Sequence, residues 1–150
     1  MDVAYLIAHW EQVRAGLIET VSKFRDQELD YRPFEGSRTA REIMLHIAHE
    51  ESIEFTYGIS QETKDPPPEY DARAYPTVSS IRAALETVHD RTRRYLATLD
   101  DDALGGVITT PWGVSNRRIE LIGHVIEHEI HHRGELSLVL GLLGREGLDA

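Results

Sequence analysis

The chain has 150 residues, no cysteine and a formal net charge of -10 at pH 7. This length predicts a single domain over residues 1–150 with one sizeable hydrophobic core. The acidic balance argues against nucleic-acid binding, which needs a clustered basic surface, and the missing cysteines exclude disulfides, thiolate metal ligands and a cysteine nucleophile.

Apolar residues recur at steps of three and four between about Val3 and Phe24, which predicts an amphipathic first helix. The early acid at Asp2, with no long apolar stretch after it, argues against a secretory signal. No apolar run in the chain approaches the roughly 20 residues that a membrane span needs. We therefore expect a soluble, cytoplasmic protein that is not bound to membranes.

A second helix follows a loop that contains Pro33 and Gly36; Ser37 or Thr39 can cap it, and it continues to about Tyr57. The next stretch, about 58–76, contains the proline-rich sequence KDPPPEYDARAYP. It is longer than an ordinary connection between bundle helices. We interpret it as a crossover or as the cover of an active site.

A third helix is predicted from Thr77 or Ser79 to about Leu99, where DDDALGG ends it. The turn PWG leads to Ser115, the expected N-cap of a fourth helix that ends at Gly144. Patterns typical of strands are scarce. The predicted fold is therefore all-α, a four-helix bundle with a long crossover between helices two and three.

The fourth predicted helix contains HVIEHEIHHRGEL, which places four of the eight histidines within nine residues. At about 100° per residue, His128 and His132 fill a gap in an apolar stripe, whereas His124 and His131 lie on its flank. The stripe consists of Leu121, Val125, His128, His132, Leu136, Val139 and Leu143. The pair His128 and His132 is therefore expected to face inward.

The second predicted helix repeats this pattern. Its inner face places a histidine and a carboxylate between apolar residues: Ile43, His46, Glu50, Ile53 and Tyr57. A buried imidazole without partners costs on the order of 1–3 kcal/mol, and a divalent metal satisfies it directly. Since His128 and His132 are four residues apart they can chelate one ion, and His46 can reach it from a neighbouring helix.

The alternative is that these histidines hydrogen-bond one another, Glu50 or trapped water in the core. We favour the metal because a pair four residues apart faces a third histidine on another helix. The remaining histidines are interpreted as surface groups or as groups around the site, with His124 and His131 nearest to it: His9, His49, His89, His124 and His131.

A protease is a further alternative, because HEIHH (128–132) matches the H-E-x-x-H pattern of zincin metalloproteases, in which the glutamate is the general base. The match is short. The downstream glycine and histidine of metzincins are missing, and the chain offers no convincing substrate-aligning strand. We rank this interpretation last.

Three stretches together resemble the DinB (DinB/YfiT-like) family of bacterial metal-binding four-helix bundles: DYRPFEG, MLHIAHEE and HVIEHEIHHRGELSLVLGLLG. The resemblance spans nearly the whole chain, including the PWG turn. It implies a bundle with one long crossover, often a homodimer, and a divalent ion, zinc or nickel, held by three histidines. Carried over residue by residue, the ligands are His46, His128 and His132, the same three that the helix faces select.

One position departs from the family, since Glu135 stands where its members usually have Gln after HHRG. Exposure to solvent is our default expectation for Glu135, and a role beside the metal is the alternative. The neighbouring Gly134 costs a helix about 1 kcal/mol relative to Ala, which suggests the close approach of another helix.

Three neutral imidazoles leave the charge of an ion uncompensated and a coordination position open, which is typical of catalytic metal sites. The resemblance implies a thiol S-transferase, using an external low-molecular-weight thiol, or a hydrolase. No catalytic residue is assigned, although Glu50 or His124 could orient ligands or move protons. Tyr70, Tyr75 and Trp112 are expected to roof the pocket. The alternative function is a non-catalytic stress-response or binding module with a structural metal.

Overall fold

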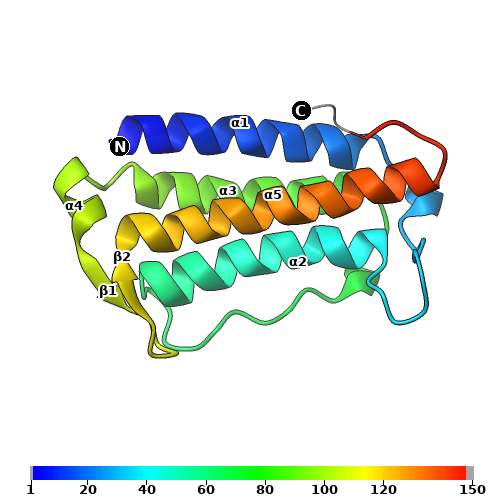
Figure 1. Cartoon of the computed structure of the whole chain (residues 1–150). Coiled ribbons are helices and arrows are strands. Elements are labelled where there is room, and N and C mark those ends of the chain that lie inside the picture. The colour runs from blue at the N-terminus through cyan, green and yellow to red at the C-terminus, as the bar shows by residue number, and fades with distance from the viewer. Residues whose placement is uncertain (1, 148–150) are drawn as a thin grey trace.

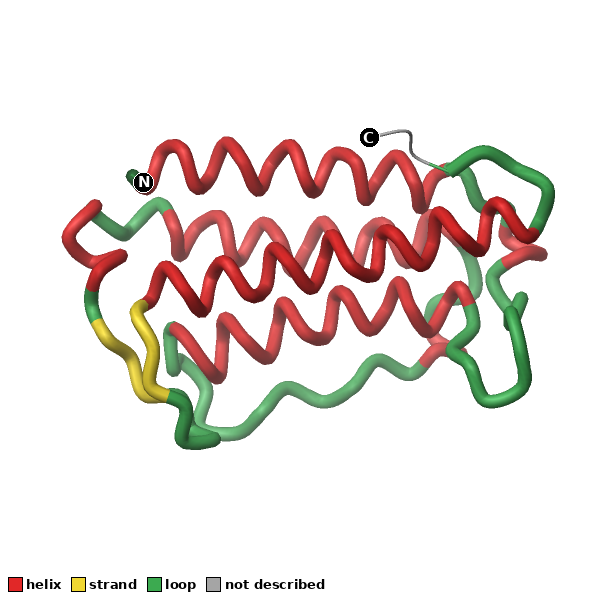
Figure 2. The backbone as a smooth tube through the Cα atoms, viewed as in Figure 1, coloured by secondary structure: helices red, strands yellow, loops and turns green. Residues whose placement is uncertain are grey.

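Four long helices dominate the computed structural model, which describes residues 2–147 (Figure 1, Figure 2). They are α1 (Val3–Ser22), α2 (Ala40–Ser52), α3 (Val78–Leu96) and α5 (Arg118–Leu142). Helix α2 packs mainly against α3, and α1 against α5, while contacts of α2 with α5 and of α1 with α3 join the two pairs. The prediction of a mostly helical protein is confirmed.

Hydroxyl side chains begin α2 and α3, as predicted. Thr39 accepts a hydrogen bond from the backbone N–H of Glu42, and the Glu42 carboxylate accepts one of 2.7 Å from the backbone N–H of Thr39. Thr77 caps α3 in the same way, together with Ser80. These reciprocal bonds satisfy backbone donors that a helix leaves free at its N-terminus.

The start of α5 differs from the prediction, because Ser115 does not cap it. Strand β1 (Val107–Thr109) pairs antiparallel with β2 (Ser115–Arg117), so that Ser115 faces Thr109 in a small hairpin. Gly113 has a φ of +88°, which allows the tight turn between these strands. Extended backbone therefore continues through residue 117, and α5 begins only after it. Helix α3 ends at Leu96, before the DDDALGG sequence that was expected to end it, and this sequence instead forms the short helix α4 (Asp101–Gly105).

The connection between α2 and α3 runs along the outside of the bundle for much of its length (Figure 1). It returns the chain to the end where α2 begins, so α2 and α3 run in the same direction. Apart from the single turn η3 (Ala72–Ala74), residues 61–77 have no helix or strand. Arg41 on α2 holds the segment in place by donating hydrogen bonds to the Tyr75 carbonyl and to Asp30.

The predicted inner face of α2 is displaced from the observed one. The buried stripe on α2 and the following π-helix η2 (Ile53–Ile59) passes instead through Met44, Ile47, Ala48, Glu51 and Phe55. His46 and Glu50 instead lie half-buried at the edge of α2. The predicted stripe of α5 is correct, because its members are buried or half-buried throughout.

Two further sequence expectations can be compared with the structure. No helix within residues 2–147 is both long and apolar enough to cross a membrane. The close helix approach expected at Gly134 is wrong, because a Cβ added there would meet no atom of another part of the described chain within 4 Å.

Candidate metal centre

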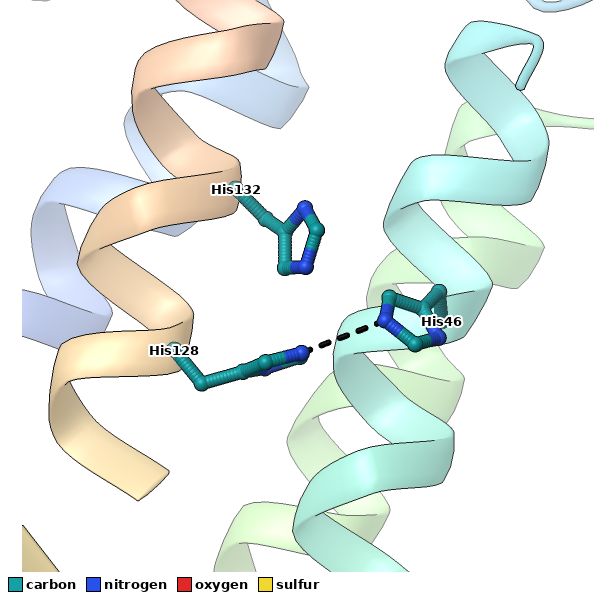
Figure 3. A group of neighbouring side chains, drawn as sticks. All are labelled: His46, His128 and His132. Atoms are coloured by element: carbon teal, nitrogen blue, oxygen red, sulfur yellow. Dashed lines mark hydrogen bonds between the residues drawn. The ribbon is translucent and has the colours of Figure 1, made fainter. Parts of the chain in front are cut away.

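Three imidazoles converge between two neighbouring helices, His46 from α2 and His128 and His132 from α5 (Figure 3). The Nε2 atoms of His46 and His128 are 3.1 Å apart. The ring centres of His128 and His132 are separated by 4.3 Å, and each lies less than 5 Å from the ring centre of His46. The structure thus brings together the three histidines that were predicted as metal ligands.

The donor set and its spacing fit a divalent metal ion. Two nitrogens that each lie about 2.0–2.1 Å from one tetrahedral ion are about 3.3 Å apart, close to the distance between the Nε2 atoms of His46 and His128. One ligand atom from each of the three side chains lies within 4.8 Å of the others. Imidazole nitrogens suit zinc and nickel among the common divalent ions.

Two of the three imidazoles have lowered pKa values, which favour the neutral form that a metal ligand must have. Burial, followed by the charge of Arg38 and of His132, lowers the pKa of His46 to about 4. Burial, followed by the neighbouring imidazoles of His132 and His46, lowers the pKa of His128 to about 3. Both side chains therefore keep a lone pair available over the physiological pH range.

Glu135 lies beside this centre, with Oε2 only 2.6 Å from Nδ1 of His132. The carboxylate is partly exposed, which agrees with the default expectation, but it also contacts a predicted ligand. Although burial acts to raise it, the hydrogen bond with His132 and the nearby imidazoles hold the pKa of Glu135 below its ordinary value. His131 is exposed but lies near the same carboxylate, with Nε2 3.4 Å from Oε1. His124 is also exposed.

A cavity of about 580 Å³ borders the centre on the side of His46. Its polar lining includes Arg38, His46, His49, Glu50, Glu69 and Tyr70. Of the three aromatic residues expected to cover the pocket, Tyr70 therefore lies at the cavity. Tyr75 packs against Tyr70 at 5.3 Å between ring centres, and Trp112 lies against Gly58.

The four long helices also contribute a buried ionic cluster: Arg14 of α1, Glu51 of α2, His89 of α3 and Glu129 of α5. Arg14 contacts Glu51 and donates a hydrogen bond of 2.8 Å to Glu129, and Glu51 pairs with His89 at 2.8 Å. The expectation that His89 is a surface group or a group around the metal is therefore wrong.

Two carboxylates of this cluster have pKa values shifted in opposite directions. Burial alone would raise the pKa of Glu51, but the charge of Arg14 and the hydrogen bond with His89 outweigh it and keep that pKa below the ordinary value. Burial raises the pKa of Glu129, which Arg14 lowers only in part. The cluster therefore holds Glu51 ionised inside the bundle.

The position of Glu129 bears on the protease interpretation. In HEIHH this glutamate would be the general base, but its side chain accepts hydrogen bonds from Trp10, at 2.9 Å, and from Arg14 on α1. Its carboxylate is thus engaged in the bundle core, where it does not face the open side of the histidine centre. Glu129 is therefore not available as the general base on which the zincin mechanism depends.

Comparisons with known proteins agree with this architecture. The family model described as the DinB superfamily matches residues 9–136. YizA of Bacillus subtilis is 33% identical over 66 residues, which cover 43% of this chain and 42% of YizA. The match thus spans less than half the length of that relative.

Two solved structures have the same fold over nearly the whole chain. A DinB-like protein from Bacillus cereus superposes with a TM-score of 0.83 at 14% identity, covering 99% of this chain and 97% of that one. YfiT from Bacillus subtilis superposes with a TM-score of 0.71 at 24% identity, covering 96% and 89%. YfiT is described as a probable metal-dependent hydrolase with an unusual four-helix bundle topology.

Proposed function

This chain belongs to the DinB superfamily, and on that basis we propose that it is a metal-dependent enzyme whose ion is held by His46, His128 and His132. The proposed architecture is the four-helix bundle with a long crossover. The proposed reaction is either the conjugation of a small external thiol to a substrate or the hydrolysis of a substrate. The observation that carries the proposal is the convergence of three imidazoles, with two Nε2 atoms 3.1 Å apart, at the edge of a cavity.

The protein side chains would bind the ion and prepare its surroundings. When bound, the ion supplies Lewis acidity, which favours deprotonation of a nucleophile such as water or a thiol. His46 and His128 present neutral nitrogens because burial lowers their pKa values, and His132 completes the set of three ligands. Since these ligands bring no negative charge, the ion would keep its full positive charge, which suits catalysis better than a purely structural role.

Groups along the cavity would position a small-molecule substrate. Arg38 lines the cavity together with His46, and the Glu50 carboxylate lies near that ring, with Oε1 3.8 Å from Nδ1. Glu54 follows Glu50 by one turn, outside the residues that line this cavity, and burial raises its pKa.

Metal analysis, followed by substrate screening, tests the proposal. Purified protein is expected to bind one zinc or nickel ion per chain, and His46→Ala, His128→Ala and His132→Ala are each expected to abolish tight binding. His9→Ala is the matched control, since His9 is an exposed histidine on α1. An unchanged metal content in His128→Ala would disprove the assigned ligands. Metal-loaded protein is then assayed for thiol conjugation and for hydrolysis.

The second candidate function is a stress-response or binding module with a structural metal, which could act as a homodimer. It is favoured if removing the ion unfolds the protein, because structural ions contribute directly to folding. The extensive core formed by all four long helices instead supports a fold that does not depend on the ion. A metal-free protein that stays folded would therefore support the catalytic role.

A further inference from the structure

We infer that Glu135 orients His132 for metal binding, by accepting the hydrogen on Nδ1 and leaving Nε2 as the ligand atom. This inference rests on the proposed function, because it concerns the same centre. It assigns Glu135 a positioning role, since the carboxylate acts through His132 and does not itself bind the ion.

The geometry of the pair fixes which nitrogen carries the hydrogen. Glu135 Oε2 and His132 Nδ1 are 2.6 Å apart, and only 7% of the His132 side chain is exposed. An ionised carboxylate can only accept hydrogen bonds, so Nδ1 is the donor. The other ring nitrogen then keeps its lone pair, and Figure 3 shows it turned toward His46 and His128.

The same distance argues against Glu135 as a ligand of a second ion. His131, His132 and Glu135 form a second group of potential ligands. Two ligands of one tetrahedral ion are separated by about 3.3 Å, whereas Glu135 and His132 are markedly closer. Their separation fits a charge-assisted hydrogen bond. The arrangement therefore corresponds to a carboxylate, a histidine and a metal in series, which orients the ring and makes it a stronger ligand.

His132 differs in this respect from His46. The carboxylate beside His46 belongs to Glu50, and its oxygen is 3.8 Å from Nδ1, beyond hydrogen-bond distance. Glu135 lies only three residues after His132 on the same helix, so the pair forms without help from another element. Glu135 also supplies one negative charge next to a centre whose three predicted ligands are histidines and so bring none.

Nuclear magnetic resonance of the imidazole nitrogens tests the orientation in metal-free protein. We expect the Nδ1–H form of His132 in the natural chain and in Glu135→Gln, whose amide oxygen still accepts the hydrogen. Glu135→Ala should show a mixture of both tautomers. A natural chain in which His132 carries its hydrogen on Nε2 would overturn the inference.

Zinc affinity, measured by competition with a chromogenic chelator, provides the second readout. Glu135→Ala is expected to bind zinc about 10- to 100-fold more weakly, and Glu135→Gln to fall between it and the natural chain. Glu127→Ala is the control, because Glu127 is an exposed glutamate on the same helix. Equal affinities for Glu135→Ala and the natural chain, or equal losses for Glu135→Ala and Glu127→Ala, would contradict the inference.

The two readouts separate this inference from the proposed function. If the natural chain binds no zinc, the proposed function fails, while the tautomer of His132 in the metal-free protein still decides the role of Glu135. If the natural chain binds zinc but the tautomer is unaffected by Glu135→Ala, only the positioning role fails. Thermal melting of each metal-free variant verifies that the bundle is intact.

Discussion

Arg14 on α1 and Glu129 on α5 form a buried ion pair of 2.8 Å, and the same guanidinium contacts Glu51 on α2. All three side chains are at most 6% exposed. Charges removed from water to this extent are tolerated only as a group, because each one depends on its partners to offset lost hydration. This cluster therefore makes the stability of the bundle sensitive to single substitutions.

Replacing Arg14 with Met should destabilise the protein strongly, because two carboxylates then remain buried without their cation. We expect a loss of roughly 3–5 kcal/mol in the free energy of unfolding, measured in urea. Arg32→Met is the control, since Arg32 is an exposed arginine paired loosely with Glu42, and it should change stability by about 0.5 kcal/mol or less. Similar losses of unfolding free energy for both variants would show that the buried cluster contributes no more to stability than an exposed ion pair.

Adding zinc should raise the melting temperature of the natural chain, because the ion binds the folded state and not the unfolded one. A ligand at 100 times its dissociation constant stabilises by about 2.7 kcal/mol. His46→Ala should lose this response, and His9→Ala should keep it. A zinc-dependent rise that persists in His46→Ala would place the ion elsewhere.

Acid should destabilise the metal-free protein through His46. Its pKa is about 4 in the folded chain against an ordinary 6.5, so the neutral form is favoured by folding. This contribution is fully present above pH 6.5 and is lost as pH falls toward 4. At about 1.4 kcal/mol per unit, it amounts to roughly 3 kcal/mol. Urea midpoints of the natural chain should therefore fall more steeply between pH 7 and 4.5 than those of His46→Phe; parallel curves would refute the assignment.

Gly58 should not tolerate a side chain, because a Cβ there would lie 2.5 Å from the indole ring of Trp112. Gly58→Ala is expected to cost about 1–3 kcal/mol and to alter tryptophan fluorescence. Combining it with Trp112→Phe should recover part of the loss, since the smaller ring leaves room. Gly123→Ala is the control, because a Cβ there meets nothing within 4 Å, and it should be neutral or stabilising.

The helical class and the three clustered histidines were predictable because both depend on local periodicity. The stripe of α5 passes through His128 and His132, and the step of four residues places both on one face whatever the packing. His46 was selected in the same way, although α2 turned out to bury a neighbouring face. The selection succeeded because an edge position on α2 still faces α5.

The ionic cluster was not predicted, although a signal for it exists. Each of Arg14, Glu51 and Glu129 lies three or four residues from buried apolar positions on its own helix. Glu51 and Glu129 were considered only within short motifs, and Arg14 was assigned no role. A charged residue on an inner face finds its partners only in the tertiary structure, since residues 14 and 129 are 115 positions apart. The hairpin was missed for a related reason, because strands of three residues carry too little periodicity to detect.

The pairing of α1 with α5 also has a consequence for the order of folding. During synthesis α1 emerges before α5, its main packing partner, which follows more than 90 residues later. Helices α2 and α3 can pair earlier, and α1 keeps part of its apolar face uncovered until α5 arrives. Contacts between such distant segments form slowly and leave hydrophobic surface exposed in the meantime. Helix α1 is thus made well before it can be enclosed.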